Sequence, residues 1–178
     1  MQKINILDEL TEPFREKVDA MMAVIRASGI SVKPFYGLRS PFEQAILWRQ
    51  SRTWDEIEQE MEKLKAAGAH KLAACIGSVG PRRGPRVTNA IPGFSWHQYG
   101  EAVDCFVVDS YGKAQWDAND RGYAIMARAA RTVGLKPGYD FGDAVHVQLN
   151  QREPHQVYTL EEIEGLLSQR WADFGKLG

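Results

Sequence analysis

The sequence predicts an α+β fold in which a small central antiparallel sheet is flanked by helices. Segments with a helical spacing of apolar residues come before, between and after a few short strand-like segments, whereas a parallel sheet would need a regular alternation of strands and helices. The chain has 178 residues, of which 44% are hydrophobic, and this is enough for one substantial core. No linker separates a second part, so we expect a single domain over residues 1–178.

Apolar spacing and capping residues predict the elements in order. Thr11 stands at a cap position before the first helix, Gly29 follows that helix, and Thr53 with Glu56 forms a capping box. In the N-terminal half we expect helices at 11–28, 41–49 and 53–68, a strand at 30–37, and a long Gly- and Pro-rich loop at 77–93 with a short strand at 86–88. In the C-terminal half we expect strands at 101–108 and 145–149 and helices at 117–133 and 159–172. Three tryptophans at helical spacing are expected in the core: Trp48, Trp54 and Trp171.

Charge and composition exclude several classes of protein. Lys and Arg number 22 against 23 Asp and Glu, so the near-neutral chain is not expected to bind nucleic acid. Apolar runs are too short for a spanning helix, and the first residues lack the basic head and apolar core of a signal peptide. The two cysteines, Cys75 and Cys105, lack the spacing of a redox or zinc pair and are expected to be buried structural residues. We expect a monomer without stable membrane insertion.

Two short segments carry residues that suit a metal site. His97 lies just before the predicted strand at 101–108, and Asp104 lies within that strand. The cluster Asp143-Ala-Val-His146 precedes or enters the last strand, and adjacent antiparallel strands would place His146 beside Asp104. Two histidines and a carboxylate are the three protein ligands that a catalytic zinc site needs, and Asp143 would be a spare carboxylate suited to act as a general base. From the residues alone, a buried core histidine with surface acids remains the alternative.

The spacing of these residues resembles a known signature. The pattern S-x-H-x-x-G-x-A-x-D, here Ser95 to Asp104, followed about 40 residues later by D-x-x-H, resembles that of zinc D,D-carboxypeptidases and L-alanyl-D-glutamate endopeptidases. These are peptidoglycan-cleaving enzymes of the superfamily that also holds lysostaphin-type peptidases and the hedgehog signalling domain. The resemblance covers roughly residues 10–150 and extends upstream to Tyr36-Gly-Leu-Arg39-Ser40 with Gln44 and Arg52, and to Val87-Thr88-Asn89-Ala90 with Pro92-Gly93.

The resemblance implies a role for each matching residue, and it implies a hedgehog-like or D-Ala-D-Ala peptidase-like fold. His97, Asp104 and His146 would bind Zn²⁺, Asp143 would be the catalytic base, and Arg39 would face the substrate or the developing oxyanion. The remaining candidates for substrate contacts or support of the site are Gln44, Ser95, Trp96 and Tyr139. Ser95 is expected to support the loop or a ligand, and Trp96 to line the groove.

The resemblance implies hydrolysis of an amide bond in the peptide stem of peptidoglycan. Because no signal peptide is evident, we expect first an L-alanyl-D-glutamate endopeptidase acting as a phage-type endolysin, made in the cytoplasm and released to the cell wall. A D-alanyl-D-alanine carboxypeptidase and a non-catalytic zinc-containing module that binds wall peptide or a protein are the alternatives. A pure binding module needs no base, so Asp143 argues against it. The arginines of the loop at 77–93 would either be solvated or contact carboxylates of the wall peptide.

Overall fold

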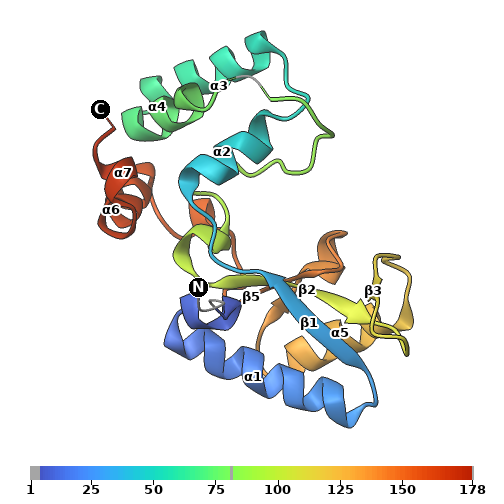
Figure 1. The fold of residues 1–178 in the computed structure, drawn as a ribbon. Coiled ribbons are helices and arrows are strands. Elements are labelled where there is room, and N and C mark those ends of the chain that lie inside the picture. The colour runs from blue at the N-terminus through green and yellow to red at the C-terminus, as the bar shows by residue number, and fades with distance from the viewer. Residues whose placement is uncertain (1–4, 81, 178) are drawn as a thin grey trace. The chain divides into compact units, whose positions relative to one another are not determined.

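Five described strands form one antiparallel sheet, and all of them belong to one of the two units into which the chain divides (Figure 1). The computed structural model describes residues 5–80 and 82–177. The first unit comprises Met1–Leu38 and Tyr99–Gln151, and the second comprises Arg39–Gln98 and Arg152–Gly178. The combination of this sheet with helices confirms the predicted α+β class.

The sheet of the first unit has the strand order β1-β2-β5-β4, and β3 pairs with β2. Its strands are β1 (Ser31–Tyr36), β2 (Ala102–Val108), β3 (Ala114–Gln115), β4 (Lys136–Pro137) and β5 (His146–Gln148). The strand predictions at 30–37, 101–108 and 145–149 are therefore confirmed as β1, β2 and β5. The two-residue strands β3 and β4 are too short to produce an alternating pattern, so the sequence did not indicate them.

Two helices, α1 (Glu12–Ala27) and α5 (Arg121–Thr132), pack against each other and against the sheet of the first unit (Figure 1). The side chains of Val103, Cys105 and Val107 belong to the same buried cluster as the apolar faces of these helices. Because side chains alternate along a strand, the residues between them on β2, including Asp104, point to the opposite face. The position of the hydrophobic core thus decides on which face of the sheet the Asp104 carboxylate lies.

The second unit is built from helices in its described part: α2 (Pro41–Arg49), α3 (Trp54–Ala66), α4 (His70–Ser78), α6 (Leu160–Arg170) and α7 (Ala172–Gly175). Helix α4 contacts α2, α3 and α7. The backbone N–H of Leu72 donates to Glu164 (2.8 Å), and the Lys71 ammonium donates to Ser168 (3.1 Å), so α4 is joined to α6 by polar contacts as well. None of the described helices is long and apolar enough to cross a membrane.

The expected loop at 77–93 differs from the structure at its start. Helix α4 extends to Ser78, and the described residues around Arg86–Thr88 form no strand, while Pro81 lies outside the described residues. The sequence did not indicate this helix because burial, which the sequence does not show, stabilises it. Its buried residues in the second unit are Leu72, Ala73, Cys75 and Ile76. Tertiary packing outweighs the weak local signal of a short segment that contains Gly77.

The helix predicted at 117–133 begins later, at Arg121. Asp120 is its N-cap, and its carboxylate accepts a hydrogen bond from the Gly122 N–H (2.7 Å). Asp117 instead accepts the N–H of Asn119 in a turn (3.0 Å). Both aspartates suit a cap position, and the turn formed by the first moves the start of the helix to the second.

The three tryptophans expected in the core have different environments. Trp48 is buried and Trp171 is half-buried, but the Trp54 side chain is 57% exposed, so the prediction for Trp54 is wrong. The guanidinium carbon of Arg49 lies 5.6 Å from the centre of the Trp54 ring. Helix α3 therefore buries Ile57 and Leu64 in its place.

Two threonines at N-cap positions offer a matched test of capping. The Thr53 hydroxyl accepts the Glu56 N–H (3.3 Å), and Glu56 returns a bond to the Thr53 N–H (2.8 Å), whereas Thr11 makes no capping bond and its buried hydroxyl has no partner among the described residues. We expect Thr53→Val to lower the free energy of unfolding by about 1 kcal/mol. We expect Thr11→Val to leave it unchanged or to raise it, because it removes an unpaired buried polar group. Urea unfolding of both variants measures the difference, and an equal loss in the two would contradict this account.

Candidate metal centre

The register of β2 against β5 places Asp104 directly opposite His146. The two side chains are buried, and His146 Nδ1 lies 3.1 Å from Asp104 Oδ1. Val103 pairs with Val147 at the next position, with both side chains fully buried in the core. The prediction that adjacent antiparallel strands bring His146 beside Asp104 is confirmed.

The electrostatics of this pair favour positive charge at the imidazole. Burial by itself lowers the pKa of His146, but the hydrogen bond and the charge of Asp104 raise it, as do the charge of Asp143 and the hydrogen bond to Gln148. The raising contributions prevail, so the pKa of His146 lies above its ordinary value. The negative charge that stabilises a proton at this position also stabilises a metal cation.

His97 lies on the short 3₁₀ helix η2 (Trp96–Tyr99) and is buried. Its carbonyl oxygen accepts a hydrogen bond from the Arg39 N–H (3.1 Å). His97, Asp104 and His146 form a group that could hold a metal ion, because one ligand atom of each lies within 4.8 Å of the others. Imidazole and carboxylate donors in the ratio two to one suit zinc with an open position.

Asp143 has a different environment from Asp104 because it is exposed to solvent in the loop before β5. Its backbone N–H donates to the Gly138 carbonyl (2.9 Å), and its carbonyl accepts from the His146 N–H (3.2 Å). The carboxylate is close enough to His146 to raise the pKa of that imidazole. An exposed carboxylate held near a candidate ligand is available for proton transfer.

Gly138 is a site residue that the sequence analysis missed. It begins the 3₁₀ helix η3 (Gly138–Phe141), and a Cβ at this position would lie 2.4 Å from the Asp143 carbonyl oxygen and 2.7 Å from His146 Cβ. The absence of a side chain lets the loop that carries Asp143 pack against the strand that carries His146. Glycines are common, and the sequence does not show that a side chain at this one would collide with Asp143 and His146.

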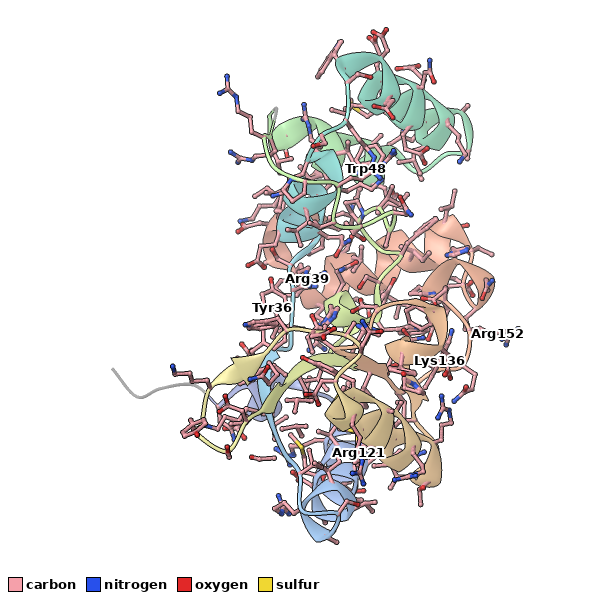
Figure 2. All side chains as sticks on the ribbon, turned by 90° about the vertical axis from the view of Figure 1, so that its right-hand side faces the viewer. Tyr36, Arg39, Trp48, Arg121, Lys136 and Arg152 are labelled. Carbon is pink, nitrogen blue, oxygen red and sulfur yellow. The ribbon has the colours of Figure 1, made fainter. Side chains whose placement is uncertain are left out.

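Gln44 is fully buried and supports Arg39 through a closed network of hydrogen bonds. Its side-chain oxygen accepts from Arg39 Nη1 (3.0 Å) and from Gln98 Nε2 (3.1 Å), and its nitrogen donates to the Ala90 carbonyl (2.7 Å). Gln98 in turn accepts the Gly93 N–H (2.9 Å). Of the two roles expected for Gln44, the structure thus places it in support of Arg39. Figure 2 shows Arg39 where the chain enters α2, with Trp48 toward the other end of that helix.

Trp96 was expected to line the substrate groove, but the structure places it in the interior. Its side chain is only 2% exposed, its indole N–H donates to the Arg152 carbonyl (2.8 Å), and its ring packs edge-on to Tyr158. The residue therefore anchors η2 in the interior. The partners of Trp96 lie more than fifty residues further along the chain, which explains why a loop position suggested exposure.

Tyr139 and Ser95 are the remaining candidates for a substrate contact or for support of the site. Tyr139 on η3 is 41% exposed and is therefore accessible, while the carbonyl of Ser95 accepts the Gln98 N–H (3.1 Å) at the start of η2. Phe141, also exposed, has its ring centre 6.0 Å from that of His146. Aromatic side chains near Asp143 thus come from η3.

The cysteines and loop arginines take no part in this group. Cys75 and Cys105 are buried, as expected; burial raises the pKa of Cys75 to about 12, and burial together with the charge of Asp104 raises the pKa of Cys105. Thiols with raised pKa values are poor nucleophiles. Arg86 in the loop lies 3.6 Å from Glu56 in an exposed ion pair.

Substitution of Gly138 tests the contact between η3 and β5. We expect Gly138→Ala to lower the free energy of unfolding by about 1–3 kcal/mol, because the added Cβ must displace backbone atoms. We also expect weaker Zn²⁺ binding in a titration, since His146 is displaced with them. The control is Gly165→Ala on α6, where a Cβ meets nothing within 4 Å; we expect it to stabilise by about 0.5–1 kcal/mol. Tolerance of Gly138→Ala in both measurements would contradict the contact.

Comparison with known proteins identifies the family of the chain. The model of the VanY family, described as D-alanyl-D-alanine carboxypeptidase, matches residues 8–160. No curated protein matches. Three solved structures are similar over most of the chain. A mutant of the vancomycin resistance D,D-pentapeptidase VanY from a VanB-type resistance cassette, in complex with Zn(II), has 17% identity and a TM-score of 0.46, with 86% of this chain and 83% of that chain covered.

VanYB in complex with D-alanine-D-alanine has 16% identity and a TM-score of 0.45, with 90% of this chain and 77% of that chain covered. The vancomycin resistance D,D-dipeptidase VanXYg, in complex with a D-Ala-D-Ala phosphinate analogue, has 15% identity and a TM-score of 0.41, with 88% and 58% covered. The match to the family model includes β1, β2 and β5 together with every residue of the candidate metal group. The chain belongs to the VanY family of D-alanyl-D-alanine carboxypeptidases.

Proposed function

We propose that this protein is a zinc-dependent carboxypeptidase that removes the terminal D-alanine from peptidoglycan stem peptides ending in D-alanyl-D-alanine. The observation that carries the proposal is the buried group of His97, Asp104 and His146 in a chain of the VanY family. The family membership supports this activity better than the L-alanyl-D-glutamate endopeptidase that the sequence analysis placed first. Endopeptidase activity, a monomeric state and phage-type lysis stay predictions.

The side chains that this chain brings together form a donor set that fits zinc. His97 and His146 supply imidazole nitrogens and Asp104 supplies a carboxylate oxygen, three ligands in all. The 3.1 Å separation of His146 Nδ1 from Asp104 Oδ1 suits atoms that share a cation. When bound, zinc supplies Lewis-acid chemistry, in that it polarises the scissile carbonyl and lowers the pKa of a water molecule.

Asp143 is the residue to which we assign proton transfer. Its exposed carboxylate would accept a proton from the attacking water and return it to the amine of the departing D-alanine, so that one water molecule is consumed for each peptide bond broken. The Gly138 carbonyl and the His146 N–H hold the backbone of Asp143 on both sides. This restraint would keep the carboxylate oriented through both transfers.

Arg39 is the cation to which we assign the negative charge of the substrate. Its guanidinium is fixed by Gln44, and its backbone is bound to His97, so two contacts limit its motion. A guanidinium held in this way suits a carboxylate or a developing oxyanion. The C-terminal carboxylate of D-alanyl-D-alanine is one such group.

The substrate can be tested with purified peptidoglycan and with a synthetic stem pentapeptide that ends in D-alanyl-D-alanine. We expect the zinc-loaded protein to release free D-alanine from both, and we expect a chelator to stop release until zinc is added back. Mass spectrometry identifies the products. New L-alanine carboxyl ends without free D-alanine would overturn the proposal in favour of the endopeptidase. Binding without any product would favour the non-catalytic module.

The role of Asp143 can be tested apart from metal binding. We expect Asp143→Asn to retain Zn²⁺ with nearly unchanged affinity while kcat falls by about 10²–10⁴, because the amide cannot accept the proton. Asp140→Asn is the matched control, since Asp140 is a nearby exposed carboxylate that pairs with Arg131. We expect Asp140→Asn to keep full activity. Equal kcat in the two variants would exclude Asp143 as the base.

A further inference from the structure

We infer that Gln148 is a positioning residue that holds His146 with its proton on Nε2 and with Nδ1 toward Asp104, so that Nδ1 is the nitrogen offered to the metal. The inference rests on the proposed function, because it concerns one of the three ligands proposed there. Gln148 is the last residue of β5 and is buried. It lies two residues after His146, so both side chains project from the same face of the strand.

The direction of the Gln148 amide follows from its two partners. Its nitrogen donates to the Asn150 carbonyl oxygen at 2.8 Å, and its oxygen lies 2.9 Å from His146 Nε2. A carbonyl oxygen can only accept, so the NH₂ end of the amide must face Asn150. The oxygen end is thereby directed at His146.

This direction determines which nitrogen of His146 carries the proton. The Gln148 oxygen is an acceptor, so His146 Nε2 must donate to it. In the neutral imidazole, Nδ1 then has a lone pair, and it faces the Asp104 carboxylate oxygen, which is also an acceptor. In that state the two lone pairs, 3.1 Å apart, need a cation between them, which is either a proton or a metal ion ligated by both atoms.

The support for Gln148 comes from the sheet. Gln148 pairs with Ala102 of β2 on one side and with Lys136 of β4 on the other, so it lies on an interior strand. Beyond it, the Leu149 N–H donates to the Glu101 carbonyl at 2.9 Å. The Asn150 carbonyl that orients the amide therefore follows a paired segment of main chain, and a rigid element can hold a ligand closely to one geometry.

A purely structural role for Gln148 predicts different behaviour from a positioning role. If the residue only fills space and satisfies Asn150, then Gln148→Leu and Gln148→Glu should perturb the protein alike, because both lose the bond to the Asn150 carbonyl. If Gln148 positions His146, then Gln148→Glu should preserve the affinity for Zn²⁺, because a carboxylate oxygen still accepts the hydrogen bond from His146 Nε2. Gln115→Leu on β3 is the control, since that amide donates to Asp109 (3.0 Å) outside the metal group.

Zinc affinity at fixed pH, measured by competition with a chromogenic chelator, separates these roles. We expect Gln148→Leu to weaken Zn²⁺ binding by about 10- to 100-fold, the usual effect of losing a hydrogen bond to a ligating histidine. We expect the Zn²⁺ affinity of Gln148→Glu and of the control Gln115→Leu to stay within about threefold of wild type, because both keep an acceptor for His146 Nε2. Unchanged affinity in Gln148→Leu, or an equal loss in Gln148→Glu, would overturn the inference. Urea unfolding of each variant verifies that the measured protein is folded.

Nitrogen-15 spectra of histidine-labelled, zinc-loaded protein provide the direct signature. We expect the His146 proton on Nε2, slow to exchange in wild type and faster in Gln148→Leu. A proton on Nδ1 with the metal on Nε2 would overturn the inference. If the wild type binds zinc with the proton on Nε2 but releases no D-alanine, then the proposed function fails and this inference stands. Failure of the wild type to bind zinc would overturn both.

Discussion

The pairing of β2 with β5 is the constraint on which the candidate site depends. Asp104 faces His146 only in the register that also places Val103 opposite Val147. Side chains alternate along each strand, so a slip of one residue would turn the valines out of the core and the polar pair into it. The packing of α1 and α5 on one face of the sheet therefore specifies the polar pairing on the other. The hydrophobic core thereby sets the pairing of Asp104 with His146, although neither residue belongs to the core cluster.

Buried amides serve the same purpose in both units. Gln44 and Gln98 form a closed network that fixes Arg39, and Gln148 connects His146 to the main chain at Asn150. A buried amide costs stability unless its donors and acceptors are paired, and each of these three amides has a partner at its oxygen and another at its nitrogen. Such pairing gives one preferred orientation. The guanidinium of Arg39 and the imidazole of His146 are each held in one orientation by such an amide.

The sequence could predict the elements and ligands whose signals are local. The alternating, valine-rich segment at 101–108 predicts β2, and the spacing of His97, Asp104 and His146 predicts the metal group. Gln148 and Gly138 could not be found in this way, because glutamines and glycines have no characteristic spacing and acquire their roles through partners distant in the sequence. Trp96 shows the same limit, since its exposure was judged from a loop position while Arg152 and Tyr158 bury it. Helix α4 likewise owes its existence to burial rather than to caps.

The two carboxylates of the proposed mechanism differ in environment more than in chemistry. Asp104 is buried in the sheet and shares its charge with His146, so it is suited to hold a cation permanently. Asp143 is exposed in the loop before β5, and its backbone is held by Gly138 and His146, so its carboxylate would exchange protons with water after each turnover. Different environments commonly give two carboxylates of one site different roles. Here one carboxylate would hold a cation and the other would transfer protons. Asp143 lies three residues before His146, which pairs with Asp104, because the polypeptide passes from an exposed loop at Asp143 into an interior strand at His146.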